Sequence, residues 1–321
     1  MLKIDYQIEI GSLVFKPGSN SRLIGLHSQS SMGAPVAYCR MAFTVPADLS
    51  MAVGDPVTVQ LGYDGDLSTV FTGAATEVEW QLDQVIVEAE SLSRQLAALR
   101  VNMYFENAFT GDIASSLAGE TELSTGRLEP GLQLPFYAVG SNRSAWDHLA
   151  ELALQCGFDL YTDERDQLVF GSAMPGVPKL FQFGINMLRF QVEERQPAVS
   201  GVEVFGESPA SHGGGPDSAT WFTKKEVKGS AGSNPKQRVY APAGRSQELT
   251  AQMANNIWSE RSIQKTGRLR TLGDAAITLG TLLQVSGMPA DHQNGTYRTT
   301  SITHRVHPVK GFLTDLQVTE V

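Results

Sequence analysis

The sequence predicts a mainly β fold (α+β) in which two related β modules flank a small α+β region. Near the N-terminus three strand-like segments follow one another, Gly54–Tyr63, Val70–Trp80 and Gln84–Ser91. Near the C-terminus a similar series recurs in the same order, Gly280–Gly287, Gly295–Val306 and Gly311–Val321. Polar and apolar residues alternate in both series, which is typical of strands with one buried face. The predicted domains are therefore residues 1–100, 101–170 and 171–321.

The first domain, residues 1–100, is predicted to be almost entirely β. Tyr6, Ile8 and Ile10 alternate with polar residues, and residues 37–45 continue the alternation. Val85 and Val87 then share one face of a further strand with Ala89. The stretch 91–99 is rich in Leu and Ala and predicts a short helix.

The region 101–170 changes to a helical pattern. Thr110 is predicted to cap a helix that Gly119 stops. A second helix is predicted after Ser144, because Ser144 and Asp147 have the spacing of a capping box, and Gly157 is placed to end this helix. Residues 158–171 are predicted to form a hairpin with a charged tip.

The third domain, residues 171–321, is predicted to return to β structure. Residues 208–236 are rich in Gly, Ser and Pro, which predicts a long loop at about 208–240. A helix is predicted at about 246–262, because Leu249, Met253 and Ile257 recur every four residues.

Composition narrows the class of protein. The 321 residues suffice for two or three domains, and no apolar run is long enough to span a bilayer. The N-terminus lacks the apolar core of a secretion signal, so synthesis in the cytoplasm is expected. Cys39 and Cys156 are expected to be small buried apolar groups.

Charge is distributed unevenly along the chain. Residues 1–170 contain 22 acidic and 9 basic residues, whereas residues 171–321 contain 12 acidic and 16 basic residues. Two interpretations stay open: two domains with differently charged solvated faces, or halves of neighbouring subunits that meet acidic edge to basic edge. The net charge of −9 argues against a protein that grips nucleic acid.

Taken together, the strand segments, the stretch 137–171 (YAVGSNRSAWDHLAELALQCGFDLYTDERDQLVFG), the helix and the C-terminal strands resemble a known family. The chain is similar to the baseplate hub proteins of contractile phage tails, the late control protein D group, and to the N-terminal hub part of VgrG spikes. The resemblance covers nearly the whole chain and implies two tail-tube-like β-barrel domains around the small middle region.

The resemblance also implies a function and partners. A homotrimer would present six barrels and adapt a sixfold tail tube to a threefold spike. The expected partners are a tail tube or tube-initiator protein, a separate spike protein and other baseplate proteins. DNA would pass through the channel without specific binding, and an acidic lining would repel it. The expected location is the virion tail baseplate, assembled in the bacterial cytoplasm.

No catalytic, cofactor-binding or metal-ligating residues are assigned. The stretch 211–216 (SHGGGP) resembles an esterase oxyanion loop, but the stretch Gly206–Ala210 around Ser208 lacks the second Gly of a nucleophile elbow. His304 and His307 would point to opposite faces of a strand, and His304 is expected to pack in the final pair of strands. The other four histidines have no ligand spacing.

Charged clusters have plain structural interpretations. Asp163, Glu164 and Asp166 around Arg165 are expected to form a solvated turn, because carboxylate catalysis needs two acids opposed across a cleft. Arg261, Lys265, Arg268 and Arg270 either complement the end of the late helix or dock on an acidic neighbour. Lys224, Lys225 and Lys228 either contact a partner or keep the loop soluble.

Two rivals to a structural hub remain. One is a cell-wall or ester hydrolase associated with the tail, which would use Ser208 or the acids near Arg165. The other is a carbohydrate-binding β protein, which needs exposed aromatic platforms. The four tryptophans are dispersed (Trp80, Trp146, Trp221 and Trp258), and only Trp221 is predicted to lie in a loop.

Overall fold

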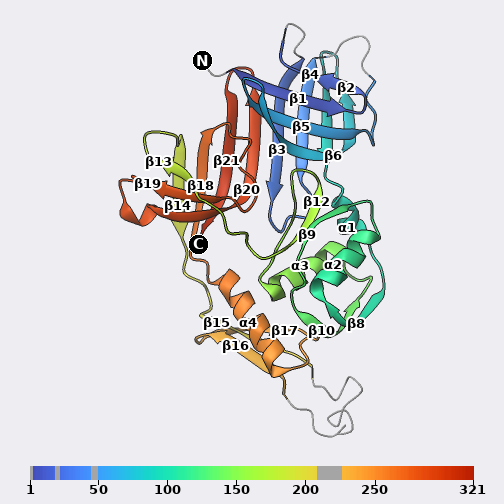
Figure 1. The fold of residues 1–321 in the computed structure, drawn as a ribbon, viewed down its shortest axis with the longest axis vertical. Coiled ribbons are helices and arrows are strands. Elements are labelled where there is room, and N and C mark those ends of the chain that lie inside the picture. The colour runs from blue at the N-terminus through green and yellow to red at the C-terminus, as the bar shows by residue number, and fades with distance from the viewer. Residues whose placement is uncertain (1–2, 19–21, 45–49, 208–225) are drawn as a thin grey trace.

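The structure is a computed structural model that describes residues 3–18, 22–44, 50–207 and 226–321. It has four parts (Figure 1). Two β modules lie side by side, a helical middle region lies beyond one end of them, and a further small sheet with its helix lies beyond that region. The predicted mainly β fold is confirmed.

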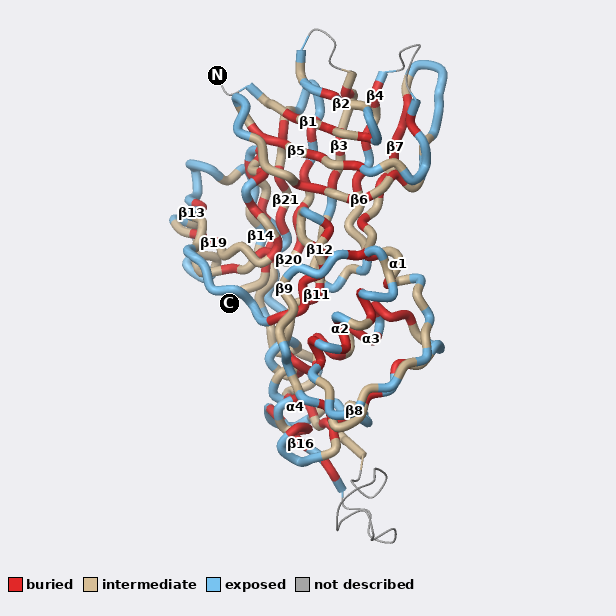
Figure 2. The backbone as a smooth tube through the Cα atoms, turned by 45° about the vertical axis from the view of Figure 1, so that its right-hand side comes forward, coloured by how far each residue is buried: buried red, intermediate tan, exposed pale blue. Residues whose placement is uncertain are grey.

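The first β module consists of seven strands, which are β1 (Ile4–Ile10), β2 (Leu13–Phe15), β3 (Leu23–Ser31), β4 (Tyr38–Thr44), β5 (Pro56–Tyr63), β6 (Asp66–Trp80) and β7 (Gln84–Glu90). Buried and exposed positions alternate along these strands, as Figure 2 shows. Strands β5 and β6 are joined by the two-residue turn Asp64–Gly65, in which both residues have positive φ. The inward-facing residues form one core that includes Ile8, Met41 and Phe43.

The second β module consists of six strands, which are β13 (Lys179–Gln182), β14 (Arg189–Glu194), β18 (Lys265–Leu272), β19 (Leu282–Ser286), β20 (Gly295–His307) and β21 (Gly311–Glu320). A short 3-10 helix, η3 (Asp291–Gln293), precedes β20. The core of this module contains Phe181, Leu269 and Tyr297.

Both modules belong to one thirteen-stranded sheet. Its main path runs β14-β18-β21-β20-β3-β4-β7-β6-β5-β1-β2, with β19 beside β20 and β13 beside β19. The central contact is the antiparallel pair β3–β20, which joins the two modules. Residues 270 positions apart in the sequence, such as Ser31 and Ser301, are therefore neighbours.

The middle region contains α1 (Arg94–Ala98), β8 (Met103–Phe109), α2 (Thr110–Gly119), β9 (Ser124–Leu128), β10 (Gln133–Val139), α3 (Ala145–Cys156), β11 (Asp159–Thr162) and β12 (Gln167–Gly171). The predicted cap of α3 is confirmed: Ser144 Oγ accepts from Asp147 N, and the Asp147 carboxylate accepts from Ser144 N, both at 3.1 Å. Gly157 ends α3 with φ 67°, as predicted.

The start of α2 differs from the prediction. Phe109 is the capping residue, and Thr110 is the first residue of the helix. The Thr110 hydroxyl donates instead to the carbonyl oxygen of Pro130 at 3.1 Å, since this side chain is buried against the following strands. Gly119 is the last residue of the helix, which therefore ends where the sequence predicts.

The remaining part of the chain contains β15 (Gly201–Phe205), β16 (Lys228–Gly232), β17 (Lys236–Tyr240) and α4 (Gln247–Arg261). The predicted late helix is confirmed, with Leu249, Met253 and Ile257 buried. The prediction of a loop is wrong for residues 228–240, because β16 and β17 pair with the two sides of β15. Small residues allow β16 to lie close to α4: a Cβ on Gly229 would lie 2.2 Å from Ala251 N of α4. Residues 208–225 lie outside the described residues.

The packing of these last elements bears on the domain division. Their apolar residues, such as Val202, Val204 and Ile257, share one core with Leu117, Leu149 and Phe170 of the middle region. Residues 201–261 therefore pack with the middle region, although they lie within the segment 171–321 in the sequence. The division at residues 100 and 170 stays a prediction.

Candidate functional site

The two β modules repeat one another strand by strand. In the first, the hydrogen-bonded order is β5-β6-β7-β4-β3, and in the second it is β19-β20-β21-β18-β14. Each strand of the first series has its counterpart at the same place in the second, and every adjacent pair in both series is antiparallel. The doubling expected from the sequence is therefore a property of the sheet itself.

The repeat extends to individual hydrogen bonds. Gly54 N donates to Ala75 O at 2.8 Å, and Ala75 N donates to the carbonyl of the residue after Gly54 at 2.9 Å. In the second module Gly280 N donates to Thr299 O at 2.9 Å, and Thr299 N donates to the carbonyl of the residue after Gly280 at 3.0 Å. Both glycines have positive φ, 94° and 84°, which favours Gly at both places.

An irregularity of the long central strand is also repeated. The register of β6 shifts between Ala75 and Glu77, and that of β20 shifts between Thr299 and Ser301. The residue skipped in each case is a threonine whose hydroxyl donates across the bulge. Thr76 Oγ1 donates to Glu88 O at 3.2 Å, and Thr300 Oγ1 donates to Gln317 O at 3.2 Å. Bulges re-aim strands, so both modules bend at the same point.

Among the unpaired strand edges of the described residues, two correspond to the joint between the modules. Strand β14 ends the sheet path, and residues 76–80 of β6 pair only with β7. By the strand correspondence β14 is the counterpart of β3, and β6 is the counterpart of β20. The two free edges are thus the counterparts of the two strands that already pair at the joint between the modules.

The face of the sheet turned away from the cores is polar near that joint; we call it the exposed sheet face. The Arg270 guanidinium donates to both oxygens of Asp315, at 2.6 and 3.1 Å, and this contact raises the pKa of Arg270. Arg305 on β20 also reaches Asp315, with Nη1 to Oδ2 at 3.1 Å. All three side chains are partly exposed, so each ion pair contributes at most about 1 kcal/mol.

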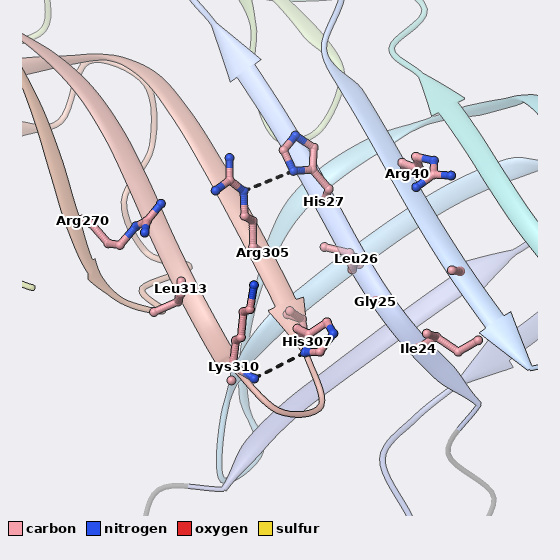
Figure 3. A pocket seen from close by; sticks show the side chains of 13 residues that line it. Ile24, Gly25, Leu26, His27, Arg40, Arg270, Arg305, His307, Lys310 and Leu313 are labelled. Carbon is pink, nitrogen blue, oxygen red and sulfur yellow. Dashed lines mark hydrogen bonds between the residues drawn. The ribbon is translucent and has the colours of Figure 1, made fainter.

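The row of charges continues across the joint. Arg305 Nε donates to His27 Nδ1 at 3.4 Å, and burial together with the Arg305 charge lowers the pKa of His27. His27 pairs with Arg40 in register, and Arg40 forms an ion pair with Glu88 at 3.2 Å. Figure 3 shows Arg305 and His27 pointing toward one another from β20 and β3.

A pocket of about 370 Å³ opens at this joint, between β3, β20 and the turn before β21. We call it the cationic pocket. It is lined by Ile24, Gly25, Leu26, His27, Arg40, Ala42, Arg270, Arg305, Val306, His307, Lys310, Gly311 and Leu313. Sequence reasoning missed it, because its residues come from five separate strands. The only feature of the sequence that points to this pocket is the alternation of basic residues in β18 and β20.

The histidine expectations can be compared with the structure. His304 is buried, and its Nδ1 lies 3.0 Å from Thr314 Oγ1 in the final pair of strands, as predicted. His307 is exposed, and its Nδ1 accepts from the backbone N of Val309 at 3.1 Å. Within the described residues, no three His, Cys, Asp or Glu side chains come together as a metal site.

The acidic hairpin tip is not the solvated turn that the sequence predicts. Asp166 is buried, and its Oδ2 accepts from Leu92 N at 2.7 Å. Burial raises the pKa of Asp166 to about 6 and also raises that of Glu164. The Glu164 carbonyl accepts from Thr72 Oγ1 at 2.9 Å. The tip between β11 and β12 therefore packs against the first module. This contact shields the Asp166 carboxylate from water.

The basic stretch is divided between two elements. Arg261 is the last residue of α4, which matches the first interpretation of this stretch. Lys265, Arg268 and Arg270 lie in β18 instead, where Lys265 contacts Glu320 at 2.9 Å. The hydrolase residue Ser208, the stretch 211–216, and Lys224 and Lys225 lie outside the described residues, whereas Lys228 begins β16.

The tryptophans do not form a platform in the described part of the chain. Trp146 is buried in α3, and Trp258 of α4 packs against the same core. Trp80 is half exposed at the free edge of β6, and Trp221 lies outside the described ranges. Both cysteines are buried and unpaired, as expected. In the parts of the chain that are described, the helices are all too short or too polar to span a membrane.

Comparison with solved structures identifies the fold. The chain is similar to a tail protein from Neisseria meningitidis MC58 (TM-score 0.74, 14% identity, covering 99% of this chain and 97% of that one). It is also similar to the 43 kDa tail protein of prophage MuSo2 from Shewanella oneidensis (TM-score 0.70, 13% identity, 98% of both chains). A third similar structure is the E. coli c3393 protein, a component of the type VI secretion system (TM-score 0.60, 12% identity, 98% and 76%).

At such identities these similarities show a common fold, that of tail proteins. No curated protein sequence matches the chain. A protein-family model described as the Alg8 N-terminal domain matches residues 39–308, which is most of the chain. The chain therefore belongs to the Alg8 N-terminal domain family.

Proposed function

We propose that this chain is a structural, non-enzymatic hub subunit of a contractile tail or related injection machine. In this proposal three copies form a ring that adapts a sixfold tail tube to a threefold spike. The observation that carries it is the β3–β20 joint between two equivalent modules. The proposal is also supported by the fold that the chain shares with tail proteins and with a type VI secretion component.

The free edges of β14 and β6 allow the pairing at the β3–β20 joint to be repeated between chains. If β14 of one copy pairs with residues 76–80 of β6 in the next, the contact between chains repeats the contact within the chain. Such a head-to-tail contact is heterologous, and it closes into a ring when the rotation permits. Two modules per chain and three chains then give six equivalent modules, and unpaired strand edges become the joining surface.

The correspondence fixes the expected register between copies. Within the chain, Ser301 pairs with Ser31 and Thr303 with Gln29. The counterparts of the first pair are Glu77 on β6 and Arg195 just after β14, which have opposite charge, whereas those of the second are Glu79 and Glu193, which are both acidic. Exposed apolar side chains also lie near both edges: Trp80 at the end of β6 with Leu82 after it, and Ile185 and Leu188 before β14.

In this arrangement the exposed sheet face would line the channel. The row at the joint carries both signs of charge, with Arg270, Arg305 and Arg40 against Asp315 and Glu88. The acidic lining expected from net charge would thus have to come from other rows, such as that of Glu77 and Glu79 on β6. The tube protein, a separate spike protein and other baseplate proteins are the proposed partners, in a virion baseplate or its equivalent.

Measuring the solution mass of the full chain, followed by electron microscopy of the particle, tests the proposal. We expect a trimer that forms an open ring. Glu77→Lys and Arg195→Glu should each weaken the trimer, and the double charge reversal should restore it. Glu120→Lys, an exposed change at the end of α2, is the matched control and should leave the mass unchanged. A strictly monomeric chain, or a closed twofold dimer, would contradict the ring.

A hydrolase remains testable on the same material. Substituting Ser208→Ala or Asp163→Asn should leave assembly intact, and the wild-type chain should show neither ester turnover nor clearing of peptidoglycan. Activity that is lost with either substitution would favour the hydrolase over the purely structural role.

A further inference from the structure

The cationic pocket combines an apolar floor with a charged rim. Ile24, Ala42 and Leu313 are half-buried in its lining, whereas the side chains of Leu26 and Val306 belong to the core on the other face of the sheet. Arg40, Arg270, Arg305 and Lys310 surround this floor (Figure 3). A pocket with an apolar interior and a few convergent polar groups is the usual form of a binding site.

Positive charge at the rim exceeds the negative charge that neutralises it. Arg270 and Arg305 share the single carboxylate of Asp315, and Arg40 pairs with Glu88. Among the described residues, no carboxylate lies within ion-pair distance of Lys310. The rim therefore has four cations and two anions, in a chain whose net charge is −9. This local excess is opposite in sign to the protein as a whole, and it favours an anionic occupant.

The two histidines of the pocket are hydrogen-bonded through Nδ1. His27 Nδ1 accepts from Arg305 Nε, and His307 Nδ1 accepts from the backbone N of Val309. A ring nitrogen that accepts carries no proton, so in this geometry each ring carries its proton on Nε2. The Nε2–H of His307 is then a hydrogen-bond donor that an anion can use, whereas His27 already makes a side-chain hydrogen bond with Gln29.

The floor and the neighbouring charges discriminate between anions. Duplex DNA presents a row of phosphates and needs a continuous stripe of cations, but Glu88 and Asp315 interrupt this row. A peptide can place an apolar side chain against the half-buried Ile24 or Leu313 while its carboxylate reaches the guanidinium groups, which bind carboxylates in a planar fork. The combination of floor and rim thus matches a peptide better than a nucleic acid.

We propose that the cationic pocket binds a segment of a partner protein in which an apolar side chain stands next to a carboxylate. The site is complete within one chain, so it is independent of ring formation. A failure of this proposal would leave the proposed hub ring untouched, and a monomeric chain would still be expected to bind the peptide.

Fluorescence polarisation with the full chain tests the site. The probe is a short dye-labelled peptide in which leucine and aspartate alternate, compared with one peptide that has serine for leucine and another that has asparagine for aspartate. We expect saturable binding of the first peptide only. Lys310→Gln, which breaks no internal ion pair, and Arg305→Gln should each weaken binding by about tenfold, the loss of one charge-assisted hydrogen bond.

Arg100→Gln is the matched control, because Arg100 is exposed and outside the pocket, and it should bind like the wild type. Equal binding of all three peptides, or binding that Lys310→Gln and Arg305→Gln leave unchanged, would overturn the proposal. So would preferential binding of a duplex DNA probe at the same residues, because the site would then recognise phosphate.

Discussion

Arg298 Nη1 lies 3.0 Å from both carboxylate oxygens of Asp159, and the two residues are 139 positions apart in the chain. Arg298 belongs to β20 of the second module, and Asp159 begins β11 of the middle region. Their side chains are only 16% and 13% exposed. Next to this pair, Gly33 N of the first module donates to Leu160 O at 2.8 Å. One short strand therefore ties both modules to the middle region.

We predict that Arg298→Met destabilises the protein by about 3–5 kcal/mol, since it leaves a buried carboxylate without its partner. Burial already raises the pKa of Asp159, and Arg298 opposes that rise. The loss should therefore be largest above neutral pH and smaller in acid, where Asp159 takes up a proton. Urea titration at several pH values measures it.

The double variant Asp159→Leu with Arg298→Met provides the control. Replacing both charges by apolar groups removes the buried unpaired charge, so most of the lost stability should return. If the double variant is as unstable as Arg298→Met alone, the contact contributes through packing and not through charge.

The buried carboxyl of Asp166 gives a second prediction. Its pKa is about 6 in the folded protein, against an ordinary value of 3.8. Between these values the folded state holds a proton that the unfolded state has released. The free energy of unfolding should therefore fall as pH rises from about 4 to about 6, by about 3 kcal/mol in all.

Asp166→Asn should remove this pH dependence and raise stability at pH 7. The asparagine amide oxygen can still accept from Leu92 N, and asparagine tolerates the φ of 59° found here. Asp163→Asn, at the same tip but only half-buried, is the comparison. Thermal unfolding from pH 4 to pH 8 distinguishes them; an unchanged profile for Asp166→Asn would mean that this carboxyl is not the source.

His304 should act in the opposite direction. Burial lowers its pKa from 6.5 to about 4, so between these values the unfolded state binds the proton and the folded state does not. Stability present above pH 6.5 should be lost as pH falls toward 4, by about 3 kcal/mol. His304→Gln, which can still accept from Thr314 Oγ1, should abolish this loss, whereas the exposed His307→Gln should retain it. Equal acid sensitivity of both variants would exclude His304.

Local features of this fold were predictable, and long-range ones were not. The Ser144 cap, the Gly157 stop and the alternating strands depend on residues close together in the sequence, so their patterns are visible there. The β3–β20 joint brings together residues such as His27 and Arg305, and nothing in either strand alone specifies that pairing. The same applies to Asp166: a charged hairpin tip is usually solvated, and only its docking against Leu92 buries it. Predicting the cationic pocket requires both the local strand pattern and the long-range β3–β20 pairing.

The change of partner along β6 gives the last prediction. Residues up to Ala74 pair with β5, and residues from Ala74 onward pair with β7. Gly73 lies at this crossing, where a Cβ would stand 2.3 Å from Glu90 O and 2.9 Å from the Phe71 ring. Gly73→Ala should therefore cost at least about 2 kcal/mol, because backbone on one side and a core ring on the other must move.

Gly119→Ala is the matched substitution. A Cβ at Gly119 meets nothing within 4 Å, its φ is not positive, and it lies in the last turn of α2. Alanine restricts the unfolded chain there and should be neutral or stabilising by up to about 1 kcal/mol. Because Gly73 stands just before the bulge that both modules share, Gly73→Ala should also weaken the proposed ring, whereas Gly119→Ala should not. Unfolding curves and solution mass for both variants, measured side by side, decide whether the bend of β6 holds the free edge in place; a fully stable and fully assembled Gly73→Ala chain would show that it does not.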